Sequence, residues 1–256
     1  MKPKLEVRGI HYSYHTPDGE TPALSDISFT VPTGEFLAIV GPSGCGKSTL
    51  LSLLCGLIQP EEGSIWIDGV PVEEEHAGIG YMLQKDHLFE WRNIYGNVAL
   101  GLEIQKKLDN HTRQNLFEML QAYGLGGFEQ ARPSELSGGM RQRAALIRTL
   151  ALKPDLLLLD EPFSALDYQT RLSVCDDISS IIRNTGKTAI LITHDLSEAI
   201  SVADRIIILS HRPGRIKSLL PINFPPEYNS PLKRRNAPEF SVYFNLVWEQ
   251  LQKEQE

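Results

Sequence analysis

The stretch Gly41-Pro42-Ser43-Gly44-Cys45-Gly46-Lys47-Ser48-Thr49 lies between two apolar runs, residues 36–40 and 50–54. This order predicts a strand, a glycine-rich turn and a buried helix, and the spacing fits a P-loop. The glycines permit backbone conformations that side chains forbid. Successive N–H groups can therefore point toward a phosphate chain at the positive end of the helix. We predict that residues 41–49 bind a nucleoside triphosphate.

Two side chains of this stretch have predicted roles of their own. Lys47 supplies a positive charge for the β- and γ-phosphates, and Ser48 supplies a hydroxyl ligand for Mg²⁺. The alternative is a glycine-rich turn with a chance Gly-Lys-Ser sequence. The apolar runs on both sides, which predict the flanking strand and helix, favour the P-loop.

Composition narrows the class of protein. The chain has 256 residues, of which 41% are hydrophobic and 22% are charged, as in ordinary globular proteins. A net charge of −7 argues against extensive nucleic-acid binding, which needs clustered Lys and Arg. The three cysteines have no framework spacing, which suits a reduced cytosolic protein. We expect neither a signal peptide at Met1-Lys2-Pro3-Lys4 nor a membrane-spanning segment.

The order of the predicted elements indicates an α/β fold. The helix after the P-loop is expected to run to about residue 58, and residues 93–150 are mostly helical in pattern. A run of four leucines at 156–159 predicts a strand buried on both faces of a parallel sheet. Other strands are predicted at residues 5–14, 27–31, 36–40, 64–67, 79–83, 188–193 and 205–209.

These elements predict a P-loop NTPase core with a mainly parallel sheet, an N-terminal antiparallel β subdomain and a helical insert. The predicted division assigns residues 1–92 and 151–215 to the nucleotide-binding core with its β subdomain. Residues 93–150 form the helical subdomain, and residues 216–256 form a C-terminal tail and helix. Five prolines predict that the tail is irregular as far as a final amphipathic helix at about 240–252.

Two acidic residues follow the four-leucine run. Asp160 ends that predicted strand, which places a carboxylate at the edge of the sheet where ligands collect in such folds. We predict that Asp160 helps to hold Mg²⁺. Glu161 follows directly and is predicted to orient and deprotonate the attacking water. The alternative is a strand that ends in solvated acids.

A second turn has the features of an anion site. The sequence Leu136-Ser137-Gly138-Gly139-Met140-Arg141-Gln142-Arg143 predicts a Ser-Gly-Gly turn that opens a helix, with free N–H groups at its start. Two such sites in one chain are hard to explain with one nucleotide per monomer. His194 follows another predicted buried strand, where it could contact a γ-phosphate, although a lone histidine is more often structural.

Taken together and in this order, the motifs resemble those of the ATP-binding subunits of ABC transporters from about residue 5 to residue 215. The resemblance implies that Gln84 contacts Mg²⁺ and the γ-phosphate, that Glu161 is the general base, and that His194 is the switch histidine. Lys47 belongs to the same catalytic set. The resemblance also matches Tyr14 with the aromatic residue that stacks on adenine, and residues 41–49 with the Walker A loop. Residues 156–160 match Walker B, and Asp167 lies in the 164–167 segment that matches the D-loop. The family signature is matched by Ser137, Gly138 and Gly139.

The resemblance also implies how two copies meet. In this family two subunits form a head-to-tail homodimer, and each ATP lies between the Walker A loop of one and the signature of the other. Such an arrangement explains two anion sites in one chain, because one isologous interface creates two identical sites. Met140 stands where many members carry glutamine, and we expect it to pack at the start of its helix.

Three local features are similar to the importer ATPases for nitrate, sulfonates, taurine, bicarbonate or a thiamine precursor. They are residues 84–91 with 97–102, residues 211–216, and Met140. The resemblance implies membrane-spanning permease subunits as partners and, indirectly, an extracytoplasmic solute-binding protein. It also implies a cytoplasmic position on the inner face of the cell membrane. The sequence does not identify the solute.

Two other classes of function remain as alternatives. One is a soluble ABC-type ATPase that acts on ribosomes or DNA. The single predicted domain, the acidic charge and the lack of a heptad insertion argue against it. The other is a non-catalytic nucleotide-binding regulator, which would need neither Glu161 nor His194.

Overall fold

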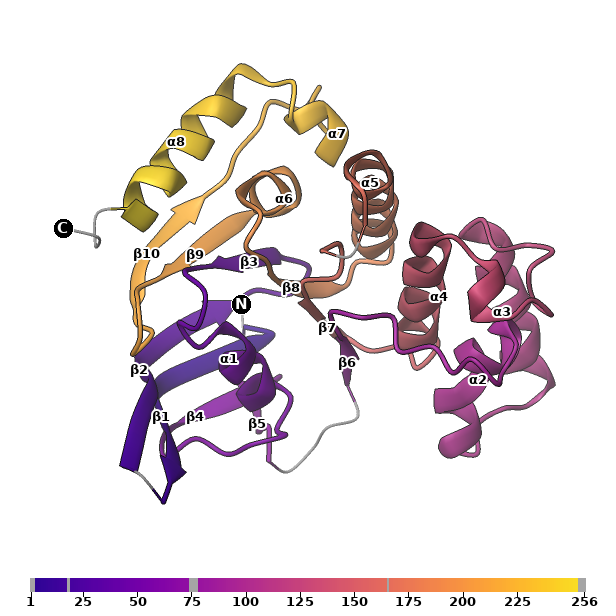
Figure 1. The fold of residues 1–256 in the computed structure, drawn as a ribbon, viewed down its shortest axis with the longest axis horizontal. Coiled ribbons are helices and arrows are strands. Elements are labelled where there is room, and N and C mark those ends of the chain that lie inside the picture. Colours follow the sequence, from indigo (N-terminus) through magenta and orange to yellow (C-terminus); the bar gives the residue numbers. More distant parts are fainter. Residues whose placement is uncertain (1–2, 18, 74–77, 165, 253–256) are drawn as a thin grey trace.

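The computed structural model describes residues 3–17, 19–73, 78–164 and 166–252. Over these residues the chain forms two sheets with helices packed around and between them (Figure 1). Some expectations concern residues outside this range. They are Met1 and Lys2 of the predicted N-terminus, Ala165 of the predicted 164–167 loop, and the last residues of the predicted C-terminal segment.

The smaller sheet is antiparallel throughout, with the strand order β2-β1-β4-β5. Its strands are Leu5–Thr16 (β1), Gly19–Val31 (β2), Glu62–Ile67 (β4) and Val70–Pro71 (β5). Asp68 and Gly69 both have a positive φ, of 53° and 80°, which lets two residues reverse the chain between β4 and β5. The predicted antiparallel β subdomain is confirmed, with longer β1 and β2 strands than expected.

The larger sheet has the strand order β10-β9-β3-β8-β7-β6, and only the β10–β9 pair is antiparallel. Its strands are Phe36–Val40 (β3), Ile79–Met82 (β6), Leu156–Asp160 (β7), Thr188–Ile192 (β8), Arg205–Leu209 (β9) and Ile216–Pro221 (β10). Strands β3 and β8 are buried at every residue because other elements cover both faces of the sheet. The predicted mainly parallel core is confirmed.

Strand β10 corrects one prediction. The sequence predicts irregular chain from residue 216 to about residue 239, whereas Ile216–Pro221 pairs with β9 along the edge of the larger sheet. A proline at the end of an edge strand costs the sheet little, since its missing N–H group is not needed there. The apolar and polar residues of β10 do not alternate along Ile-Lys-Ser-Leu-Leu-Pro, so no strand period marks this segment in the sequence.

Helix α1 (Lys47–Leu54) lies between the two sheets, and its leucines contribute to the core that the sheets share (Figure 1). The helix ends at Leu54 rather than at about residue 58. Gly56 has a φ of 68°, a left-handed conformation that terminates helices and that glycine adopts without strain.

The opposite face of the larger sheet carries two further layers. Helices α5 (Tyr168–Asn184) and α6 (Leu196–Val202) pack on that face through separate apolar clusters. Helices α7 (Pro231–Arg234) and α8 (Pro238–Gln252) lie over α6 (Figure 1). The predicted C-terminal amphipathic helix is confirmed, beginning two residues earlier than the predicted start at about 240.

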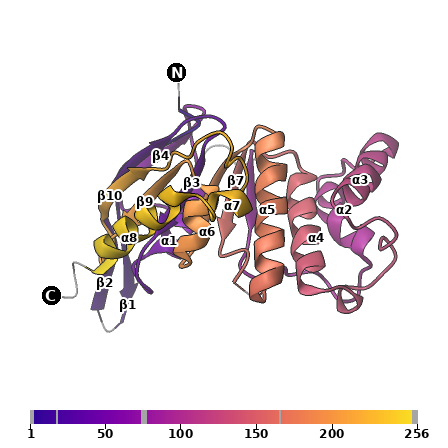
Figure 2. The same cartoon turned by 90° about the horizontal axis from the view of Figure 1, so that it is seen from above.

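The predicted helical segment lies at one end of the molecule. It contains α2 (Ile94–Ile104), α3 (Asn110–Ala122), the 3-10 turn η1 (Pro133–Glu135) and α4 (Gly138–Leu150). The three α-helices share an apolar cluster of their own. Figure 2 shows α4 beside α5, with α2 and α3 farther out, so α4 joins the helical part to the core. The domain boundaries at residues 92, 150 and 215 stay predictions.

Within the residues that the structure describes, we find no helix with the length and apolar character needed to cross a membrane.

Candidate nucleotide-binding site

The predicted P-loop connects β3 to α1. Gly44 and Gly46 have φ angles of 76° and 103°, which side chains rarely adopt. A Cβ atom at Gly41 would lie 2.8 Å from Cys45 Sγ, and a Cβ atom at Gly46 would lie 2.7 Å from Leu24 Cδ2. A Cβ atom at Gly44 would meet nothing within 4 Å. The backbone thus needs glycine at all three positions, either for conformation or for space.

The Lys47 ammonium lies inside the P-loop. It donates hydrogen bonds of 2.8 Å to the carbonyl oxygens of Gly41 and Pro42, and the residue is buried. A positive charge is therefore held at the loop, with two of the three ammonium donors on backbone carbonyls and a longer contact of 3.8 Å to Cys45 Sγ.

A cavity of about 620 Å³ opens beside the loop. That volume lies within the range of about 300–1,000 Å³ that is usual for small-molecule sites. The residues that line it come from several elements and are Tyr14, Ala23, Ser43, Gly44, Gly46, Lys47, Ser48, Thr49, Glu161, His194 and Arg212. The Tyr14 ring is partly exposed, and its hydroxyl is 2.9 Å from Thr49 Oγ1. The cavity therefore brings together the P-loop, Tyr14, Glu161 and His194.

Arg212 lines the cavity, although the sequence motifs did not predict that it contacts the nucleotide. The sequence marked residues 211–216 only as a feature of a subfamily. The Arg212 Nε atom donates a 2.9 Å hydrogen bond to the carbonyl of Pro22, next to cavity-lining Ala23. The position of Arg212 shortly after β9 could have indicated this contact, because loops after parallel strands gather at the ligand-binding edge of such sheets.

Three predicted catalytic side chains meet at Glu161. Its Oε2 atom lies 3.1 Å from His194 Nδ1 and accepts a 3.1 Å hydrogen bond from Gln84 Nε2. The Gln84 amide also lies 3.4 Å from Ser164 Oγ, which in turn donates to the Glu161 carbonyl. Glu161 has a φ of 42°, a left-handed conformation that is uncommon for a residue with a side chain. The carboxylate is thus held at the end of β7 by groups from the ends of β6 and β8.

The three predicted Mg²⁺ ligands are placed differently. Ser48 lines the cavity, whereas the amide of Gln84 is bonded to Glu161. Asp160 accepts a 3.3 Å hydrogen bond from the Tyr81 hydroxyl, and burial raises the pKa of its carboxyl group. A hydroxyl, an amide oxygen and a carboxylate are all oxygen ligands of the kind that Mg²⁺ prefers. The donor set fits Mg²⁺, because Gln84 bonds Glu161 through its Nε2 atom rather than its amide oxygen, and Asp160 accepts from Tyr81 through Oδ2, one of its two carboxylate oxygens.

The Ser-Gly-Gly turn forms the start of α4. Ser137 is the N-cap, and its Oγ accepts a 3.3 Å hydrogen bond from Met140 N. A Cβ atom on Gly139 would lie 2.9 Å from side-chain atoms of Thr170 and Val174, so glycine here lets α4 approach α5 closely. Met140 packs against the helical cluster, as predicted. Ser137, Gly138 and Gly139 do not line the cavity described above.

Asp167 also lies outside the cavity lining. It caps α5, since its Oδ1 accepts a 3.1 Å hydrogen bond from Thr170 N. Hydrogen bonds from the Thr170 side chain and backbone lower the pKa of the Asp167 carboxyl group. The carboxylate is therefore held in its charged form at a helix N-terminus.

Comparisons with known proteins agree with this geometry. A family model described as "ABC transporter" matches residues 24–164. The uncharacterized ABC transporter ATP-binding protein YtlC of Bacillus subtilis is 44% identical over 96% of this chain and 95% of that protein. The taurine import ATP-binding protein TauB of Burkholderia pseudomallei is 40% identical over 99% of this chain and 98% of that protein. The Escherichia coli protein of the same name is 41% identical over 86% of this chain and 85% of that protein.

Solved structures with the same fold include two of the cassette MJ0796. A dimeric structure described as a bacterial ABC transporter cassette has a TM-score of 0.74 and 28% identity, covering 86% of this chain and 99% of that one. A dimeric post-hydrolysis state bound to ADP and Pi has a TM-score of 0.71 and 28% identity, covering 83% of this chain and 98% of that one. The chain described here belongs to the ATP-binding, ATP-hydrolysing subunits of ABC transporters.

Proposed function

We propose that this subunit powers an importer for a small anion or a related solute of the nitrate, sulfonate, taurine, bicarbonate or thiamine-precursor type. One observation carries the proposal. The Burkholderia relative named as a taurine import ATP-binding protein is similar over 99% of this chain, including the C-terminal segment that follows the family match. Similarity over almost the whole chain covers the surfaces that would contact permease subunits as well as the nucleotide site, so it bears on the type of transporter.

We infer that ATP lies along the P-loop, with its adenine on Tyr14 and its phosphates on the N–H groups and charge of residues 41–49. The cavity volume and its glycine-lined wall support this assignment. The Lys47 ammonium, which the loop carbonyls of Gly41 and Pro42 hold in place, supplies positive charge to the phosphates. Tyr14 already lines the cavity with a partly exposed ring, which suits stacking on a base.

Glu161 is the proposed general base. It takes a proton from the attacking water, while Gln84 and His194 orient its carboxylate and respond to the γ-phosphate. Ser48, Gln84 and Asp160 are the proposed ligands of Mg²⁺. An ion held there would neutralise negative charge on the nucleotide phosphates. The convergence of Gln84 and His194 on one carboxylate oxygen supports these roles.

A second copy completes the site in this proposal. Ser137, Gly138, Gly139 and Asp167 act on the nucleotide of the partner subunit in a head-to-tail homodimer. Their position outside the cavity of their own chain supports a role in trans. The similar MJ0796 structures are described as dimeric, which supports a pair of the same kind.

The proposed position is at the inner face of the cell membrane, bound to permease subunits that receive solute from an extracytoplasmic binding protein. Trp91 is a candidate anchor for the permease. Its side chain is 73% exposed and stacks on Phe89 with 4.6 Å between the ring centroids. A rigid exposed aromatic near the nucleotide-contacting Gln84 suits an interface anchor.

The test is reconstitution of this subunit with its permease in vesicles. We expect ATP hydrolysis to rise when the solute-loaded binding protein is added and uptake to require ATP. If the subunit does not associate with a permease and its ATPase activity does not respond to a binding protein, the result supports the alternative, an ABC-type ATPase that is not coupled to transport.

A further inference from the structure

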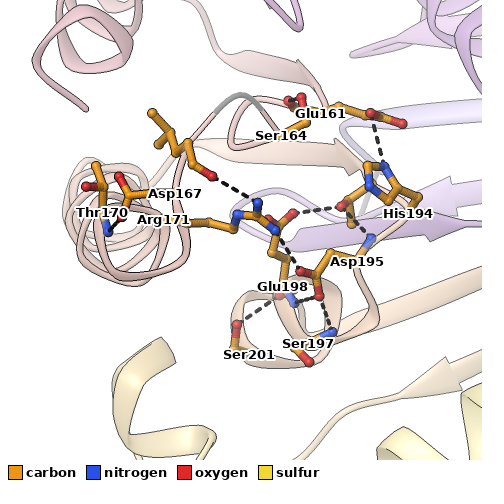
Figure 3. Close-up of polar contacts among 12 residues, drawn as sticks. Glu161, Ser164, Asp167, Thr170, Arg171, His194, Asp195, Ser197, Glu198 and Ser201 are labelled. Carbon is orange, nitrogen blue, oxygen red and sulfur yellow. Dashed lines mark hydrogen bonds and ion pairs between the residues drawn. The ribbon is translucent and has the colours of Figure 1, made fainter. Parts of the chain in front are cut away.

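Arg171, on the first turn of α5, joins two loops that flank the candidate site (Figure 3). Its Nη2 donates a 2.9 Å hydrogen bond to the carbonyl of Leu166, the residue before Asp167. Its Nη1 lies 3.3 Å from Asp195 Oδ2, and its Nε lies 3.8 Å from Glu198 Oε1. One guanidinium thus contacts the loop that carries Asp167 and the residues that follow His194.

Glu198 carries the connection further into the loop. Its side chain is only 3% exposed, and its Oε2 accepts a 2.7 Å hydrogen bond from Thr193 Oγ1. The same Thr193 hydroxyl accepts a 3.0 Å hydrogen bond from Asp195 N. Asp195 in turn caps α6 by accepting from Ser197 N and Glu198 N. The backbone is therefore anchored on both sides of His194 (Figure 3).

The His194 ring depends on these anchors. Its side chain is 63% exposed, so surrounding packing does little to fix it, while its Nδ1 lies 3.1 Å from Glu161 Oε2. A shift of the backbone at Thr193 or Asp195 moves the imidazole relative to Glu161. Misplacement of a catalytic group by about 1 Å can cost up to about a hundredfold in rate.

We propose that Arg171, acting with Glu198 and Thr193, is a positioning residue that sets His194 against Glu161 and ties this loop to the Leu166–Asp167 backbone. The inference rests on the proposed catalytic roles of Glu161 and His194. It adds Arg171, Glu198 and Thr193, none of which lines the cavity. The longer contacts of Arg171, at 3.3 and 3.8 Å, exceed the usual length of about 2.7–2.9 Å for charge-assisted bonds, so the network has room to tighten.

Helix α5 offers a matched control. Arg183 lies on the same helix and ties it to the chain at the other end of α6, donating 2.6 and 2.9 Å hydrogen bonds to Val202 O and Asp204 Oδ1. Arg183→Gln therefore removes a similar number of helix contacts without touching the His194 loop. Any loss that reflects only weaker packing of α5 is shared by both variants.

The experiment compares steady-state ATP hydrolysis of the full-length variants at a temperature where both are folded by circular dichroism. We expect Arg171→Gln to lower kcat about 10- to 100-fold, with KM for ATP changed by less than about twofold, because position rather than binding is lost. Arg183→Gln is expected to keep the wild-type kcat. Equal losses in the two variants, or a wild-type kcat in Arg171→Gln, would overturn the proposal.

A double-mutant cycle with His194→Ala separates this proposal from the proposed site. If Arg171 acts through His194, adding Arg171→Gln to His194→Ala causes little further loss in phosphate release. A further loss as large as in the wild-type background overturns the positioning role while leaving the site intact. A His194→Ala subunit at the wild-type rate instead contradicts the proposed site, and the positioning role with it.

Thr193 provides a second route if Arg171→Gln does not fold. Thr193→Val removes the hydroxyl that bonds Glu198 and Asp195 but keeps the shape of the side chain. We expect kcat to fall in Thr193→Val and to be restored largely in Thr193→Ser, which keeps the hydroxyl. Equal kcat values in the valine and serine variants would overturn the network.

Discussion

His194 Nδ1 lies 3.1 Å from Glu161 Oε2 although the two residues are far apart in the chain. The contact arises because Glu161 follows β7, His194 follows β8, and these neighbouring strands are parallel, so their carboxyl ends meet at one edge of the sheet. Gln84, after β6 on the other side of β7, donates to the same oxygen. The sheet order thus places the proposed base between two groups that can orient it.

Glu161→Gln is expected to keep ATP binding and to lose about 10²- to 10⁴-fold in hydrolysis rate, because a glutamine cannot take the proton of water. Binding of a fluorescent ATP analogue and release of phosphate measure the two effects separately. Glu227→Gln, in an exposed segment, is the control and should behave as wild type. Wild-type hydrolysis by Glu161→Gln would reject Glu161 as the base.

Lys47→Ala is expected to weaken ATP binding itself, because it removes the charge held at the P-loop. The affected quantity differs from that in Glu161→Gln, so the two variants separate binding from chemistry. Titration with the same fluorescent analogue measures the change. An unchanged dissociation constant for ATP would contradict the proposed phosphate contact.

Trp91→Ala is expected to leave the ATPase activity of the isolated subunit roughly intact and to impair transport by the assembled complex. The reason is that the side chain is 73% exposed, so its removal opens no cavity in the core but takes away a surface that could bind the permease. Trp248→Ala, a second exposed tryptophan on α8, is the matched control. Equal losses of ATPase and transport in Trp91→Ala would mean that Trp91 only supports the fold.

The proposed head-to-tail homodimer, in which each nucleotide lies between two subunits, predicts that ATP promotes dimerisation. The effect should be strongest in Glu161→Gln, where the γ-phosphate persists and keeps binding the closed state. Size-exclusion chromatography with light scattering, at saturating ATP and Mg²⁺, measures the mass directly. A strictly monomeric Glu161→Gln protein, together with undiminished specific activity in dilute wild type, would exclude the head-to-tail dimer.

The ATPase activity of a mixture of two inactive variants also tests whether each nucleotide site is shared between two subunits. Lys47→Ala damages the P-loop, and Ser137→Arg crowds the turn at the start of α4. In a mixed dimer one site pairs an intact P-loop with an intact Ser-Gly-Gly turn, so partial recovery of ATPase activity is expected on mixing. Ser137→Arg subunits that are fully active on their own would contradict a role for this turn in hydrolysis.

Glu198 should make stability depend on pH. The pKa of its carboxyl group is raised from 4.5 to about 7, and burial is the largest cause. Asp195 also raises this pKa, whereas the Thr193 hydrogen bond, Arg171 and Arg235 limit the rise. Between these two values the folded state holds a proton that the unfolded state has released. The contribution of Glu198 to the free energy of unfolding therefore falls as the pH rises from about 4.5 through 7, by about 3 kcal/mol in total.

Glu198→Gln removes this titration. Relative to wild type, the variant is expected to gain stability on going from pH 4.5 to pH 8, by up to about 3 kcal/mol. Urea denaturation at several pH values measures the difference between the two proteins. The same pH dependence in both would show that Glu198 does not titrate in this range.

The sequence by itself determined the elements whose causes are local. The glycine spacing of residues 41–49, the four leucines at 156–159 and the apolar runs of β3, β8 and β9 depend on backbone conformation and on burial within a few residues. The P-loop, the mainly parallel sheet, the antiparallel subdomain and the helical segment could therefore be predicted. Element ends were less certain, as the early end of α1 at Leu54 shows.

Only the tertiary structure decided which distant groups meet. The order of β6, β7 and β8 brings Gln84 and His194 to one oxygen of Glu161, and the pairing of β10 with β9 adds a strand that no local pattern marks. Arg212 reaches the cavity, and Arg171 meets Glu198, through contacts between segments that are separate in sequence. Such contacts depend on how strands pair and helices pack, and residue spacing along the chain does not encode them.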